Sequence, residues 1–122
     1  MAQQSTQNDY LFLFRGGASP EDLSPEQMQQ LMNKWFAWIG QMKSLGQYKA
    51  GEPLHDEGMV LSGKNGKVVT DGPFVESKET VGGYIIVHAG DMAEAVEIAK
   101  GCPIFDNNGT VEVRPIQHMS ES

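Results

Sequence analysis

The sequence predicts an α+β domain with a ferredoxin-like antiparallel sheet, two helices on one face of that sheet and an inserted β-hairpin. Three observations predict this class. The patterned segments follow one another as strand, helix, strands with a hairpin, strand, helix and strand. Two of the predicted strands carry apolar runs without alternation, and both helices have one apolar side.

The first strand and the first helix have the clearest patterns. Residues 10–14 are five apolar residues rich in aromatics, which favours a strand. Ser24-Pro25-Glu26-Gln27 is typical of a helix start, with Ser24 as N-cap, Pro25 at the first helical position and Gln27 three residues after the cap. Gly46 ends the helix, and Phe36 falls off its apolar stripe. The stripe consists of Met28, Leu31, Met32, Trp35, Trp38, Ile39, Met42 and Leu45.

The remaining elements follow from turn residues and periodicity. Lys64-Asn65-Gly66-Lys67 predicts a hairpin turn, because Asn-Gly readily adopts positive φ angles. Asp91 is the expected N-cap of a second helix that Gly101 ends. We expect strands near residues 48–50, 59–62, 67–70, 82–88 and 110–116, and the second helix at about 92–100. In the last strand Val111 and Val113 point one way, and Glu112 and Arg114 the other.

The two fully apolar strands predict a second copy of the chain. Both helices cover one face of the sheet, so apolar side chains such as Phe12 and Ile86 need cover on both faces. A second sheet of the same kind would supply it. We therefore expect a homodimer whose sheets pack face to face.

Length and charge bound the class of protein. The chain has 122 residues, enough for one domain of about 100–200 residues, which we place at 10–117 between tails at 1–9 and 118–122. A net charge of -7 with scattered basic residues argues against nucleic acid or an anionic membrane as partner. No signal peptide or membrane span is recognisable, and one cysteine cannot form an internal disulfide. The prediction is a cytoplasmic protein.

The segment from Asp71 to Tyr84 concentrates the charge that a site would need. Asp71 could act as a general base in a cleft, or simply as a turn residue before Gly-Pro. Glu76 and Lys78 share a face of an extended chain, and with Arg114 they could hold a small anionic ligand or form a structural ion-pair network. Phe74 and Trp35 are the expected apolar members of the same ligand site.

Other candidate groups give weaker signals. His88 lies at a strand end on the face of Tyr84 and Ile86, where it is a second catalytic candidate or a packed histidine. Gly82-Gly83 predicts a bulge or a close backbone approach. Cys102 follows a helix C-terminus, which disfavours a thiolate. No glycine-rich phosphate loop or convergent zinc set is present, so we expect no cofactor and no metal.

The order of these motifs resembles the DGPF branch of the YCII-related family. The resemblance rests on Asp71-Gly72-Pro73-Phe74, Glu76-x-Lys78-Glu79, Gly82-Gly83-Tyr84 and Val113-Arg114-Pro115, and it runs from about residue 10 to residue 116. It implies a dimeric α+β barrel and little about chemistry. In the wider family a histidine of the first helix and an aspartate after the second helix are a proposed catalytic pair. This chain has no histidine in that helix and has Cys102-Pro103 at the second position, so the pair is not carried over.

Three functions remain open from the sequence. The first is a homodimer that binds a small ligand between sheet and helices. The second is a cofactor-free lyase or dehalogenase acting on a small aromatic or hydroxylated anion. The third is a regulatory protein-interaction module. A cleft carboxylate or histidine with a shifted pKa would favour the second, an apolar cavity the first, and a leftover apolar patch the third.

Overall fold

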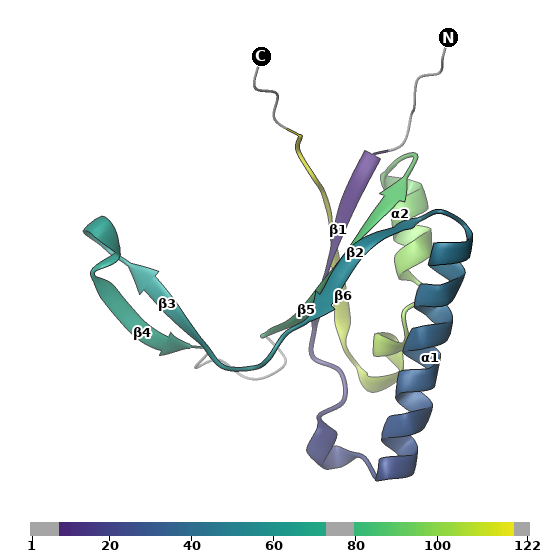
Figure 1. The fold of residues 1–122 in the computed structure, drawn as a ribbon, viewed down its shortest axis with the longest axis horizontal. Helices are drawn as coiled ribbons and strands as arrows, with labels where there is room; N and C mark the ends of the chain where they lie inside the picture. Colours follow the sequence, from purple (N-terminus) through teal and green to yellow (C-terminus); the bar gives the residue numbers. More distant parts are fainter. Residues whose placement is uncertain (1–7, 73–79, 119–122) are drawn as a thin grey trace.

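The computed structural model describes residues 8–72 and 80–118. Its centre is a four-stranded antiparallel sheet in the order β2-β5-β1-β6 (Figure 1). If β1, β2, β5 and β6 are counted as strands 1 to 4, this order, taken from the β6 edge, is the 4-1-3-2 order of a ferredoxin-like sheet. The predicted fold class is therefore confirmed. The strands are β1 (Asn8–Arg15), β2 (Tyr48–Pro53), β5 (Val81–Ala89) and β6 (Thr110–Pro115).

Two helices, α1 (Pro25–Ser44) and α2 (Met92–Ala99), cover the same face of this sheet (Figure 1). The predicted capping box of α1 is present: the Gln27 backbone N–H donates to Ser24 Oγ at 3.1 Å, and Gln27 Oε1 accepts from the Ser24 N–H at 2.9 Å. The Asp91 carboxylate caps α2 by accepting from the Glu94 N–H at 2.9 Å. Short 3-10 turns lie at Pro20–Asp22, Lys64–Gly66 and Pro103–Asn107.

The core forms between the helices and one face of β1 and β5. Alternate side chains of the two strands are buried there against α1 and α2. Phe12 is fully buried and stacks on Trp38 with ring centroids 6.4 Å apart. The buried apolar side chains are Tyr10, Phe12, Phe14, Trp38, Met42, Ile85, Val87, Ala89, Ala95, Ala99, Cys102 and Ile104.

None of the described helices lies on the other face of the sheet (Figure 1). Leu11, Leu13 and Ile86 point to it and are only half-buried. We call this surface the bare face. The prediction that β1 and β5 are apolar on both sides is therefore reflected in the structure, and one side lacks cover among the described residues.

The hairpin of β3 (Gly58–Ser62) and β4 (Val68–Gly72) is a separate two-stranded sheet that stands away from the main body (Figure 1). Its turn has the predicted positive φ angles, 59° at Asn65 and 66° at Gly66. We call β3, β4 and the turn between them the arm. It projects from the side of the main sheet opposite to α1 and α2.

The boundary of the N-terminal tail needs correction. We expected residues 1–9 to form a tail, but β1 begins at Asn8, and Asp9 is a buried residue paired opposite His88. Asp9 follows a polar segment and was therefore counted with the tail. In the fold its charge is compensated by Lys49 and His88, which lie on β2 and β5. Of the described helices, none has the length and apolar character needed to cross a membrane.

Candidate functional site

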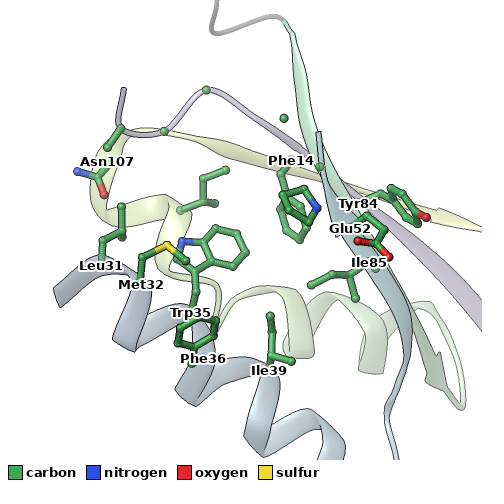
Figure 2. Close-up of a pocket in the computed structure, with 18 of the residues that line it drawn as sticks. Phe14, Leu31, Met32, Trp35, Phe36, Ile39, Glu52, Tyr84, Ile85 and Asn107 are labelled. Carbon is green, nitrogen blue, oxygen red and sulfur yellow. The ribbon is translucent and has the colours of Figure 1, made fainter. Parts of the chain in front are cut away.

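A cavity of about 400 Å³ lies between α1 and the sheet, next to the edge strand β2 and its neighbour β5 (Figure 2). The helix supplies one wall, the two strands supply the other, and the segment after β1 closes one end. Figure 2 shows Trp35 rising from α1 into the space between the helix and the sheet. The described residues of the lining are almost all apolar or glycine.

The pocket exists because α1 packs tightly over only part of its length. Trp38 and Met42, in the C-terminal half of the helix, are buried. Nearer the N-terminus, Met32 is 39% exposed and Phe36 is 61% exposed, and both side chains line the pocket. Phe36, which fell off the predicted stripe, is therefore a wall residue. The apolar side of the helix thus extends beyond the part that the core covers.

Glycines form the facing wall of the pocket and let β2 and β5 approach closely. A Cβ added to Gly51 would lie 2.7 Å from both Tyr84 O and Ile85 Cγ1, and one added to Gly83 would lie 3.1 Å from Glu52 O. The register of β1 with β5 skips Gly82. The predicted bulge and the predicted close approach at Gly82-Gly83 are both confirmed.

Aromatic rings organise the inner end of the pocket. Trp35 meets Phe14 edge to face, with ring centroids 5.2 Å apart and an interplanar angle of 86°, and meets Trp38 at 5.7 Å and 76°. Trp38 Nε1 donates to Ile98 O at 3.2 Å, whereas no described residue accepts a hydrogen bond from Trp35 Nε1. The structure places Trp35 in the pocket wall, and its contact with a ligand stays a prediction.

Polar groups in the described lining are few. Glu52 is the one carboxylate, Asn107 supplies a side-chain amide, and no Lys, Arg, His or Cys is present there. Figure 2 shows the side chains of Glu52 and Tyr84 directed away from the Trp35 indole. Among these residues, therefore, no nucleophile is paired with a base in the way that covalent or acid–base catalysis requires.

The predicted catalytic residue Asp71 does not lie in this pocket. It is exposed on β4, opposite Met59, and borders a shallow depression of the arm with Glu57 and Gly58. The expectation that it would face a cleft between sheet and helix fails because the hairpin forms its own sheet. Phe74, Glu76 and Lys78, the other predicted members of the segment, lie outside the described residues.

The structure also places Arg114 away from the pocket. It pairs opposite Leu11 on β1, so its side chain lies on the bare face, where it is 65% exposed. Its Nε is 3.9 Å from Glu112 Oε2, while Glu112 Oε1 accepts a hydrogen bond from Arg15 Nη1 at 2.7 Å. The alternation predicted for this strand is correct, but it did not reveal which side the helices cover.

A cluster of charged side chains, centred on Asp9, lies at one end of the bare face. The Asp9 carboxylate accepts from Lys49 Nζ at 2.8 Å, and His88 Nδ1 lies 2.6 Å and His118 Nε2 3.3 Å from its oxygens. The Lys49 hydrogen bond, followed by the smaller effect of His88, lowers the pKa of Asp9 despite the opposing effect of burial. We call Asp9, Lys49, His88 and His118 the Asp9 cluster.

The sequence pattern marked His88 as a candidate residue but did not indicate its partner, Asp9. Asp9 was hidden at the end of a polar segment, and its pairing with His88 depends on the register of β1 with β5. Asp9 lies two residues before Leu11 and therefore on the same side of the strand. This alternation was the one signal in the sequence that could have placed Asp9 on the face of Leu11. Within residues 8–72 and 80–118, no set of His, Cys, Asp and Glu is arranged to hold a metal ion.

Cys102 is buried where α2 is followed by the 3-10 turn at Pro103–Asn107. Burial raises the pKa of its thiol to about 12. Burial and the raised pKa agree with the prediction that Cys102 is no reactive thiolate, with desolvation as the first cause rather than the end of the helix.

Comparison with known proteins gives one family and a distant structural match. The sequence profile of the YCII-related domain matches residues 10–120. No curated protein matches the chain. A similar solved structure is 5-chloro-2-hydroxyhydroquinone dehydrochlorinase (TftG) from Burkholderia phenoliruptrix AC1100 in complex with 2,5-dihydroxybenzoquinone. It has 15% sequence identity and a TM-score of 0.45, over 90% of this chain and 95% of that chain. Because the family profile spans most of the sequence, the chain belongs to the YCII-related domain family.

Proposed function

We propose that this protein binds a small, planar and largely apolar molecule in the pocket between α1 and the β2–β5 edge. The observation that carries this proposal is the surplus apolar surface of α1. Met32 and Phe36 remain 39% and 61% exposed inside a concave site, although apolar surface is stabilised by removal from water. A ligand between helix and sheet would remove it from water, as in most small-molecule sites.

The lining also favours a particular ligand chemistry. Trp35, Phe14 and Phe36 offer aromatic faces and edges, which suit a flat ring. Trp35 Nε1 and the Asn107 amide are donors for a hydroxyl or carbonyl oxygen. The described lining contains no cationic side chain, so the anion that the sequence suggested has no counter-charge there. We expect a neutral molecule to bind more tightly than an anion of the same shape.

The alternative function, a lyase or dehalogenase, requires a base positioned against the ligand. Glu52 is the one carboxylate in the described lining, and its side chain points away from the aromatic end. The Asp9–His88 pair has suitable groups at 2.6 Å, but it lies on the bare face, across the sheet from the pocket. Separation of the apolar pocket from the paired ionisable groups favours binding over catalysis.

We propose further that the functional unit is a homodimer formed through the bare face. Leu11, Leu13 and Ile86 provide its apolar centre, and Glu112 and Arg114 provide charge toward the β6 edge. A second copy would cover these side chains by packing sheet on sheet at about 10 Å. Ile86→Asp should convert the dimer to a monomer in sedimentation velocity, and a wild-type chain that sediments as a monomer at micromolar concentration would overturn this part.

Ligand binding is tested by tryptophan fluorescence during titration with 1-naphthol, with 1-naphthoate as the anion of similar shape. Quenching that saturates, with weaker binding of 1-naphthoate, is expected. Phe36→Ala should weaken 1-naphthol binding about tenfold, since it removes part of an aromatic contact surface. The control is Phe105→Ala, because Phe105 is 47% exposed but lies outside the pocket lining. Equal effects of the two substitutions, or no saturable quenching, would contradict the proposal.

A further inference from the structure

The arm exposes more apolar side chains than its own hairpin can cover. Met59 and Leu61 are each 62% exposed, and Val60, Val68 and Val69 are about half exposed. The register places Met59, Leu61 and Val69 on one side of the arm, since Leu61 pairs with Val69 and Met59 with Asp71. Val60 and Val68 lie on the other side.

A two-stranded hairpin of this kind needs a partner. Each strand has five residues, and the arm forms a sheet of its own, apart from the four-stranded sheet. An isolated two-stranded hairpin is only marginally stable in water, and contiguous exposed apolar surface on a soluble protein marks an interaction site. The side with Met59, Leu61 and Val69 is the broader apolar side, and it is the one that we expect to be covered.

We infer that the arm packs with its Met59–Leu61–Val69 side against a second copy of this chain and clasps the dimer. The inference rests on the proposed homodimer. In Figure 1 the arm projects from the side of the main sheet opposite to α1 and α2, which is also the side of the bare face. A copy seated on the bare face would therefore lie on the side toward which the arm extends.

The length of the arm is sufficient for this contact. A strand of five residues spans about 17 Å at roughly 3.4 Å per residue, and two packed sheets lie about 10 Å apart. The arm can therefore reach beyond the space between two sheets onto the body of the partner. By two-fold symmetry each copy would clasp the other.

Charge supports a second copy as the occupant. The tip of the arm carries Lys64 and Lys67, with no acidic residue from Ser62 to Thr70, while the whole chain has a net charge of -7. A basic tip is attracted to an acidic partner, and another copy of this chain is such a partner. The same attraction disfavours docking on a basic surface such as that of a nucleic-acid-binding protein.

The first test is a charge placed on the covered side of the arm. Leu61→Asp should weaken dimerisation at least about a hundredfold in sedimentation velocity, because each dimer would lose two buried leucines. The matched control is Ser62→Asp, which adds the same charge at the next residue, on the opposite side of the arm. Equal dimer dissociation constants for the wild type, Leu61→Asp and Ser62→Asp would overturn the inference.

The second test separates the arm from the bare face. Amide hydrogen exchange of residues 58–72 is compared in wild-type dimer and in the Ile86→Asp monomer. Slower exchange of the arm in the dimer is expected, and equal exchange in both would overturn the clasp while leaving a dimer through the bare face intact. A monomeric wild type would overturn both. The inference that the arm packs on a second copy would also be overturned if amide exchange of residues 58–72 slowed only when an unrelated protein was added.

Discussion

Asp9→Asn tests whether the Asp9 cluster stabilises the fold by charge. The Asp9 side chain is 9% exposed, whereas the Lys49 and His88 side chains that contact it are 48% and 31% exposed. The substitution preserves the shape of the side chain and removes its negative charge. Because Lys49 and His88 can turn to water when the charge is lost, no unpaired buried cation remains.

The magnitude follows from these exposures. A hydrogen bond to a charged group contributes about 1.5–3 kcal/mol, and solvent screening of the half-exposed Lys49 reduces this value. We expect Asp9→Asn to lower the free energy of unfolding by about 1–2 kcal/mol at pH 7. The control is Asp56→Asn, an exposed loop carboxylate with no described cation within ion-pair distance, which should change stability little.

The pH dependence separates charge from packing. The pKa of Asp9 is lower in the folded chain than in the unfolded chain, mainly because of Lys49. Its contribution is therefore complete above the unfolded pKa of about 3.9 and is lost as the pH falls through the lower folded pKa. Urea unfolding followed by circular dichroism at fixed protein concentration should show a lower stability of Asp9→Asn than of wild type at pH 7 and at pH 5. The difference should shrink below about pH 4. A difference that persists unchanged at the lowest pH, or none at pH 7, would refute this reasoning.

Three further substitutions and one labelling reaction test the packing and the helix cap. Gly51→Ala should destabilise the chain by more than about 1 kcal/mol in thermal or urea unfolding, because its Cβ would meet Tyr84 O at 2.7 Å. Gly40→Ala in α1 meets nothing within 4 Å and should stabilise by about 0.5–1 kcal/mol; the opposite order of the two variants would contradict the packing described. Ser24→Ala should cost about 1 kcal/mol through loss of the capping box, and an unchanged melting temperature would argue against that cap. Cys102 should react with a thiol reagent at neutral pH only when the chain unfolds, and rapid labelling of the native protein would show that it is accessible.

Local patterns predicted most of the secondary structure. The aromatic run of β1, the cap and stripe of α1 and the Asn-Gly turn of the arm each depend on residues close in sequence. Alternation also gave the correct sides of β6. These features arise from backbone preferences and side-chain periodicity, which a single sequence records directly.

The candidate site was harder to predict because it depends on how the elements pack. The pocket lies between α1 and the sheet; Trp35 was a predicted member of its wall, whereas Phe36, beside the predicted stripe, was not. Arg114 was assigned to the pocket although its strand directs it to the bare face. The cleft was one of two alternatives for Asp71, and the sequence did not reveal that its hairpin forms a separate two-stranded sheet. Pairing of Asp9 with His88 likewise required the strand register.

The most direct test of the central claim, a ligand pocket under α1, is the response of the two indole N–H groups in ¹H–¹⁵N NMR spectra. Trp35 Nε1 has no described acceptor and belongs to a side chain of the pocket wall, whereas Trp38 Nε1 is bonded to Ile98 O at 3.2 Å and serves as an internal control. On addition of 1-naphthol the Trp35 signal should shift in a saturable manner while the Trp38 signal changes little. Two unchanged indole signals at saturating 1-naphthol, or a shift of Trp38 alone, would contradict the account.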